Sequence, residues 1–170
     1  LILIYYLITR RRELNKLTPK DYVVKTIVTT ELAATIAKRN GVEIFDCYTG
    51  FKWIADVIRK NEGIKQYIGG GEESYGFLAG DFVRDKDSVS ACCLFAEVAA
   101  WAKDRGKTMY QLLQDIYVEY GFSKEVSVSL VRKGKEGADE IEAMMKNFRN
   151  NPVKTLAGSQ VTLLKDFAKL

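Results

Sequence analysis

The chain has 170 residues, which suits one core, or one domain with part of a second. With 47% hydrophobic and 28% charged residues, two prolines and no low-complexity tract, it has the composition of a globular protein and not of a disordered linker. The net charge of +4 is mild, and the basic residues form no dense block, so no nucleic-acid partner is expected.

The chain opens on the apolar residues 1–8, which we interpret as part of a buried helix that runs to about Leu17 and is ended by Thr18-Pro19. This stretch is far short of the roughly 20 apolar residues that cross a bilayer, so no membrane partner is expected. It also lacks an initiating Met and a basic leading segment, which makes it a poor signal peptide. We therefore expect the chain to begin inside a longer protein.

Strand and helix patterns then alternate. Residues 22–29 are rich in β-branched side chains and predict a buried strand. A helix is expected over 31–40, with Thr30 as its cap and Gly41 as its stop. A second strand is expected over 42–48.

Further helices follow. The first has an apolar stripe made of Phe51, Ile54, Ala55 and Ile58. A short strand at Tyr67-Ile68 then leads into a glycine-rich loop. The pattern over 88–105 is the strongest helix prediction, and its apolar side is expected to hold Val89, Cys92, Ala96 and Ala99. Gly106 ends this helix, and Thr108 starts another that runs to about Tyr120.

This alternation is typical of an α/β domain with a mixed or parallel sheet and helices on both faces. Past a hinge at 121–123 the character changes, and strands are expected over 126–130 and 161–164, in a partial α+β segment. The helix between them has one apolar face, made of Ile141, Met144, Met145 and Phe148. We expect residues 1–121 to form one domain and residues 122–170 to begin a truncated second one.

The cysteines Cys47, Cys92 and Cys93 form neither an even set nor a C-x-x-C pair. We interpret them as buried thiols in a reducing compartment, the cytoplasm, and not as a disulfide frame or zinc site. The chain has no histidine, so catalysis would have to use Lys, Glu, Asp or Tyr.

The most informative stretch is residues 69–76, Gly-Gly-Gly-Glu-Glu-Ser-Tyr-Gly. Glycines let the backbone approach a ligand closely, and carboxylates and a hydroxyl suit a polyhydroxylated molecule. Alternate residues of an extended segment point the same way, so Glu72 and Ser74 are expected to share a face while Glu73 supports the loop. The alternative is a glycine-rich surface turn with solvated acids.

Two other places carry candidates. Thr49-Gly50 precedes a helix, whose free N–H groups suit phosphate or sugar oxygens, although Thr49 is alternatively an ordinary N-cap. Lys52 either faces the same cleft or is solvated. Lys86 either reaches an anionic ligand or forms a surface ion pair with a neighbouring Asp85 or Asp87.

Nearby residues have simpler roles. Arg84 shares the ambiguity of Lys86 and is a candidate for orienting the loop, and Asp87 is most simply a helix cap. The glycines match neither the P-loop nor the dinucleotide pattern.

Four segments together resemble the phosphohexomutases, the family of phosphoglucomutase and phosphomannomutase. They are residues 24–30, the Thr-Gly-Phe-Lys turn at 49–52, the loop at 69–76 and the Arg-Asp-Lys-Asp run at 84–87. They occur in the order of the family's third, sugar-binding domain, and the form of the loop is closest to the phosphoglucomutase branch. The aspartates at 81, 85 and 87 do not match the family's metal loop, so no metal site is expected here.

The resemblance implies an intramolecular phosphotransferase, an isomerase of carbohydrate metabolism. It would interconvert hexose 1-phosphate and hexose 6-phosphate through a phosphoserine, a hexose 1,6-bisphosphate and Mg²⁺. It implies that Glu72 and Ser74 hold hexose hydroxyls and that Lys86 reaches the phosphate or a ring oxygen. The family's phosphoserine, metal and fourth-domain phosphate loops are absent, so this chain alone is expected to be inactive and to need the remaining domains of its polypeptide.

Two other readings stay open. One is a non-catalytic α/β module that binds a sugar, a nucleotide or a peptide. The other is a different phosphosugar enzyme, such as an isomerase, in which Glu72 acts as the base. The sequence does not choose among glucose, mannose and amino sugars.

Overall fold

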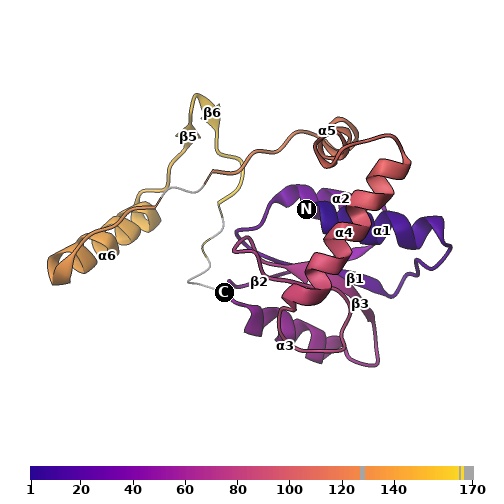
Figure 1. Ribbon diagram of the computed structural model, residues 1–170. Coiled ribbons are helices and arrows are strands. Elements are labelled where there is room, and N and C mark those ends of the chain that lie inside the picture. The colour runs from indigo at the N-terminus through magenta and orange to yellow at the C-terminus, as the bar shows by residue number, and fades with distance from the viewer. Residues whose placement is uncertain (127–128, 165, 167–170) are drawn as a thin grey trace. The chain divides into compact units, whose positions relative to one another are not determined.

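The computed structural model describes residues 1–126, 129–164 and 166, and the chain forms two compact units, Leu1–Glu125 and Val126–Leu170 (Figure 1). No helix in these ranges is both long and apolar enough to cross a membrane.

The first unit is built on a four-stranded sheet in the order β2-β1-β3-β4. The central strand β1 (Asp21–Thr26) pairs in parallel with β2 (Glu43–Cys47) and β3 (Gln66–Gly71). The short β4 (Phe77–Leu78) returns antiparallel to β3. The sheet is therefore mixed, with a parallel core, as the alternating sequence predicts.

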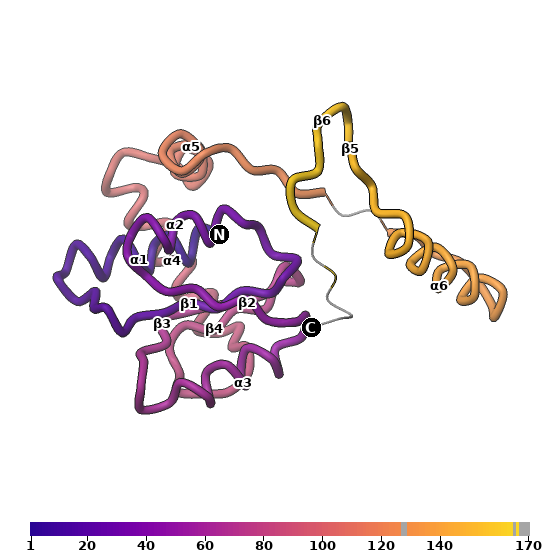
Figure 2. Tube along the Cα trace, turned by 180° about the vertical axis from the view of Figure 1, so that it is seen from behind, coloured from indigo at the N-terminus to yellow at the C-terminus, as the bar shows by residue number. Residues whose placement is uncertain are grey.

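Helices cover both faces of this sheet (Figure 2). On one face α3 (Phe51–Asn61) packs its residues Phe51, Ile54 and Ile58 against Tyr22 and Val24 of β1. The other face carries α1 (Ile2–Glu13), α2 (Glu31–Arg39), α4 (Ser88–Asp104) and α5 (Met109–Tyr120). Successive strand residues point to opposite faces, so each layer receives alternate side chains of β1. The predicted fold class is confirmed.

Several predicted helix ends are confirmed. Thr30 caps α2 by accepting a hydrogen bond from the Leu32 N–H, and Gly41 follows the helix at φ +70°. Thr108 and Gln111 form a capping box at the start of α5. The first helix ends at Glu13, earlier than expected, because residues 14 and 15 form a turn before the proline.

The sequence analysis was wrong about the glycines at 69–71, which belong to strand β3 and not to the loop that follows. A Cβ on Gly70 would lie 2.4 Å from the Val24 carbonyl oxygen, and one on Gly69 would lie 2.6 Å from Leu7 Cδ1. At Gly70 no side chain fits, because the clash is with backbone, whereas at Gly69 the flexible tip of Leu7 would have to move.

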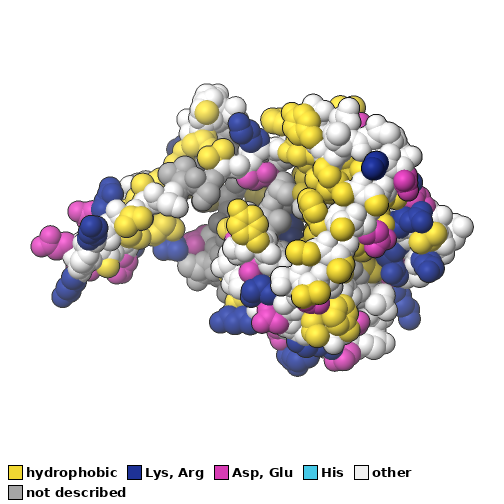
Figure 3. Space-filling model, viewed as in Figure 1, with side chains coloured by type: hydrophobic (Ala, Val, Ile, Leu, Met, Phe, Trp, Pro, Cys, Tyr) yellow, Lys and Arg dark blue, Asp and Glu magenta, His cyan; other side chains and the backbone are white. Residues whose placement is uncertain are grey.

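The predicted inner face of α4 was also wrong. Leu94, Val98 and Trp101 are buried, whereas Val89, Cys92 and Ala96 are exposed. This helix is apolar on most sides, so periodicity does not choose a face, and the bulkier side chains bury more area. Figure 3 shows hydrophobic side chains gathered on the side of the first unit that carries α4.

The cysteines are likewise less buried than predicted. Cys92 and Cys93 are exposed on α4, and Cys47 at the end of β2 is half-buried. All three are free thiols, as expected.

The second unit contains α6 (Gly134–Asn150) and a hairpin of β5 (Thr155–Leu156) and β6 (Ser159–Gln160). The strand expected over 161–164 was wrong, because the pairing residues lie earlier, on either side of a turn at Ala157-Gly158, both at positive φ. Of the strand expected over 126–130, Ser127 and Val128 lie outside the described residues, and the others are not in a strand.

The buried face of α4 yields a stability prediction. Val98→Ala removes fully buried methyl groups and should lower the free energy of unfolding by about 2 kcal/mol. Val89→Ala on the same helix is the control and should change it by less than about 0.5 kcal/mol. Urea unfolding followed by tryptophan fluorescence measures both values. A larger loss at Val89 than at Val98 would contradict the assigned face.

Candidate functional site

The parallel strands end together at one edge of the sheet. Thr26 pairs with Cys47, and Lys25 pairs with Gly71, so the three carboxyl ends are in register. The turn at 27–30, the turn at 48–50 and the loop at 72–76 leave this edge side by side. Ligands of open α/β sheets bind at the carboxyl ends of the strands, so this edge is the candidate site.

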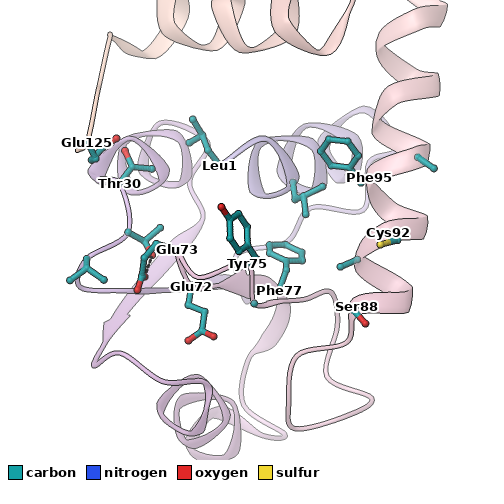
Figure 4. A pocket seen from close by; sticks show the side chains of 16 residues that line it. Leu1, Thr30, Glu72, Glu73, Tyr75, Phe77, Ser88, Cys92, Phe95 and Glu125 are labelled. Atoms are coloured by element: carbon teal, nitrogen blue, oxygen red, sulfur yellow. Dashed lines mark hydrogen bonds between the residues drawn. The ribbon is translucent and has the colours of Figure 1, made fainter. Parts of the chain in front are cut away.

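The loop at 72–76 is a tight turn between β3 and β4. The Glu72 N–H donates to the Gly76 carbonyl at 2.8 Å, and Ser74 is exposed in the turn. A Cβ on Gly76 would lie 2.6 Å from Glu72 Oε1, so the glycine makes room for the glutamate. Figure 4 shows Glu72 and Tyr75 leaving this loop in opposite directions, Glu72 toward α3.

Glu73 holds the loop to the end of β1. Its Oε2 accepts hydrogen bonds from Thr26 Oγ1 at 2.7 Å and from Thr29 Oγ1 at 3.3 Å. The prediction that Glu73 supports the loop is confirmed.

The turn before α3 differs from the alternative in which Thr49 is an ordinary N-cap. The N-cap is Gly50, at φ +107°, and not Thr49, and no described side chain makes a capping hydrogen bond there. A glycine is favoured because L side chains rarely adopt this backbone conformation. The first N–H groups of α3 and its partial positive charge therefore face the candidate site without a side-chain cap.

The two lysines lie beside this turn. Lys86 Nζ is 5.6 Å from the centre of the Phe51 ring, and Lys52 Nζ is 5.3 Å from that of Trp53. Lys86 also lies 3.4 Å from Asp85 Oδ1, a pair between exposed side chains that contributes little. Both ammonium groups thus remain near solvent at the start of α3.

Arg84 and Asp87 frame the loop before α4. Arg84 pairs with Glu62 at 2.8 Å and shares a surface hollow with Lys52. Asp87 accepts a hydrogen bond from the Val89 N–H at 3.0 Å, which confirms it as the cap of α4.

Lys25 is a residue that the sequence analysis missed. Its side chain is fully buried, and its Nζ lies 3.0 Å from Glu31 Oε1 and 3.0 Å from Asp46 Oδ1. A lysine directly after the apolar run Tyr22-Val23-Val24 of a buried strand was the available signal, because a buried ammonium requires partners.

The thiol of Cys47 lies at the same edge of the sheet, at the end of β2. Burial raises its pKa to about 11, with the nearby carboxylates of Asp46 and Glu72 adding to the shift and Lys25 opposing it. Glu72 therefore lies within electrostatic range of the end of β2, on the side of the Thr49-Gly50 turn.

A pocket of about 810 Å³ opens on the opposite side of the loop. Glu72 and Glu73 also line it, but its walls are mainly apolar side chains of α1, β4 and α4, among them Leu3. Figure 4 shows Phe77 and Phe95 on these walls. Such walls do not suit a hydroxyl-rich anion, so we place the site on the α3 side of the loop.

Within the described ranges no group of three or more Cys, Asp or Glu side chains is arranged to hold a metal ion. The residues present therefore do not fit a magnesium site.

Fold and site together define an α/β domain whose polar loops gather at the carboxyl edge of its parallel strands. Residues 1–120 match the family described as phosphoglucomutase/phosphomannomutase, alpha/beta/alpha domain III. The chain therefore belongs to the phosphoglucomutase/phosphomannomutase family.

Two individual relatives are similar to this chain in sequence. The phosphoglucomutase of Staphylococcus haemolyticus (strain JCSC1435) is 34% identical over 169 residues, which is 99% of this chain and 30% of the relative. That of Staphylococcus aureus (strain MRSA252) is 38% identical over 145 residues, 85% of this chain and 26% of the relative. The chain thus spans less than a third of the length of these curated relatives.

A solved structure shares the fold. The open form of the Paramecium phosphoglucomutase pp63/parafusin superposes with a TM-score of 0.57 at 19% identity, over 87% of this chain and 26% of the other.

The environment of Cys47 predicts its reactivity. At pH 8 a half-buried thiol with a pKa of about 11 is almost entirely protonated, so iodoacetamide should alkylate it far more slowly than the exposed Cys92 and Cys93. Peptide mass spectrometry over time measures the three rates, and unfolding in urea should bring them together. Equal rates in the folded chain would contradict the described edge.

Proposed function

We propose that this chain is the sugar-recognition part of a phosphohexomutase. The observation that carries the proposal is the orientation of Glu72, whose carboxylate is directed from the loop toward the start of α3. A carboxylate accepts hydrogen bonds from two adjacent hydroxyls of a hexose, and Ser74 offers a further donor and acceptor.

The phosphate end of the substrate is assigned to the start of α3. Gly50 leaves the first N–H groups of α3 without a side-chain cap, and Thr49 precedes them. Lys86 and Lys52 add mobile positive charge beside that turn. A hexose phosphate would then lie between the loop and this helix end.

The proposed reaction of the whole protein is the exchange of phosphate between the 1- and 6-hydroxyls of a hexose, by way of a bisphosphorylated sugar. This domain would bind the hydroxyls in both orientations of that sugar, which positions it without taking part in bond making. The phosphoserine and the Mg²⁺ site are assigned to other domains of the polypeptide, because the family's phosphoserine and metal motifs do not occur in this sequence. The chain alone is therefore expected to bind and not to turn over.

The proposal extends to the organisation of the chain. Residues 1–121 would be the sugar-recognition domain, and residues 122–170 would begin a phosphate-binding domain. A cytoplasmic location is part of it, and the free state of Cys47, Cys92 and Cys93 is consistent with a reducing compartment.

Glu72 gives the direct test. Glu72→Ala should weaken binding of glucose 1-phosphate at least about tenfold, because it removes a charged acceptor from the sugar hydroxyls. Calorimetric titration of the 170-residue chain measures the dissociation constant. Glu43→Ala is the matched control, since Glu43 begins β2 at the opposite edge of the sheet. Equal effects of the two substitutions would refute the assigned site.

Lys86 separates recognition of phosphate from recognition of sugar. Lys86→Gln should weaken glucose 1-phosphate binding about fivefold, the value of an exposed charge pair, and leave the weaker binding of glucose unchanged. Titrations with both ligands measure the difference. An equal loss for both would show that Lys86 acts on the sugar or on the loop, against the assignment.

A further inference from the structure

The buried ammonium of Lys25 is central to the carboxyl edge of β1. Besides its ion pairs with Glu31 and Asp46, it donates to the carbonyl oxygens of Thr26 at 3.4 Å and Thr29 at 3.3 Å. An ammonium has three protons, so these four acceptors share its full donor capacity. The contacts fix the turn from Thr26 to Thr29, whose ends also meet through the Thr29 N–H and the Thr26 carbonyl at 3.0 Å.

The same turn holds the loop at 72–76. Thr29 Oγ1 and Thr26 Oγ1 lie 2.9 Å apart, and Thr26 Oγ1 lies 2.7 Å from Glu73 Oε2. Each hydroxyl has one proton: Thr26 donates to the carboxylate, and Thr29 donates either to Thr26 or directly to Glu73 Oε2 at 3.3 Å. A hydrogen bond to a charged acceptor is among the stronger ones, so Glu73 is held firmly.

We propose that Lys25 is a positioning residue for sugar recognition, acting through Thr26 and Glu73. The ammonium fixes the turn, the turn hydroxyls fix Glu73, and Glu73 fixes the loop that presents Glu72. This inference rests on the proposed function but concerns residues that do not touch the ligand.

The layout favours this role over a purely stabilising one. A buried ion pair is often no more stabilising than well-packed apolar residues, so stability alone is a weak reason for a lysine at this position. The strand needs no charge here for its pairing, since β1 is bonded on both sides through its backbone. The contacts of Lys25 instead lead, one residue at a time, to the loop.

The test removes the hydrogen bond between Thr26 and Glu73 by a substitution that disturbs the fold little. Thr26→Val keeps the shape and the backbone pairing of the residue but removes the hydroxyl that reaches Glu73. We expect the heteronuclear NOE of the amides at 72–76 to fall and glucose 1-phosphate to bind about fivefold more weakly, the loss typical of one hydrogen bond. Thr26→Ser should restore both. Thr35→Val is the matched control, because its hydroxyl bonds only within α2.

We call the contacts from Lys25 through Thr26 to Glu73 the relay. A double-mutant cycle tests whether Thr26 and Glu73 act through the same contact. Glu73→Ala should act at least as strongly as Thr26→Val, because it also removes the contact with Thr29 Oγ1, and the double variant should be no worse than Glu73→Ala alone. Lys25→Met should loosen the same amides. Because that variant risks unfolding, Glu31→Gln, which weakens one partner of the ammonium at an exposed position, serves as the gentler probe of the anchor.

The two readouts separate the inference from the proposed function. Unchanged loop order and unchanged affinity in Thr26→Val would overturn the relay while leaving sugar recognition in place. A loosened loop in Thr26→Val, in a chain whose parent binds no glucose 1-phosphate, would support the relay as a loop anchor and overturn its role in sugar recognition. Additive losses in the double variant would also overturn the relay.

Discussion

The close approach of β3 to its neighbours is the constraint on which the site depends. No side chain fits on Gly70 or Gly71, since a Cβ there would lie 2.4 Å from the Val24 carbonyl oxygen or 2.5 Å from the Gly76 carbonyl oxygen. Only with these glycines does β3 reach the edge of the sheet in register with β1, and only then does the loop begin where Thr26 can bond to Glu73. Substitution in this strand would displace the loop itself, well before any ligand contact is altered.

Because the loop begins at this place, its two adjacent carboxylates have different roles. Glu73 points back to the threonines of the β1 turn and holds the loop. Glu72 points toward the start of α3, where Gly50 leaves the helix N-terminus uncapped and two lysines lie nearby. The arrangement suits a ligand with hydroxyls at one end and a phosphate at the other, which is the chemistry of a hexose phosphate.

Much of the fold and part of the candidate site were predictable from the sequence, because the local signals agree with the fold. Thr30, Thr108 and the stripe of α3 follow from capping and periodicity. The extended backbone expected at residues 72–74 was wrong, because residues 73 and 74 form a turn. The face of α4 was not predictable, because the helix is apolar nearly all round and only tertiary packing chooses its side. Lys25 was missed since its partners Glu31 and Asp46 come from other elements, which meet only when the sheet assembles.

The most direct test of the central claim is a map of the amide chemical shifts of the chain during titration with glucose 1-phosphate. The account predicts that the largest changes cluster at the carboxyl edge, in residues 49–52, 71–76 and 84–87. Changes centred instead on the apolar pocket between α1 and α4 would contradict it, because the ligand would then bind on the other side of the loop at 72–76.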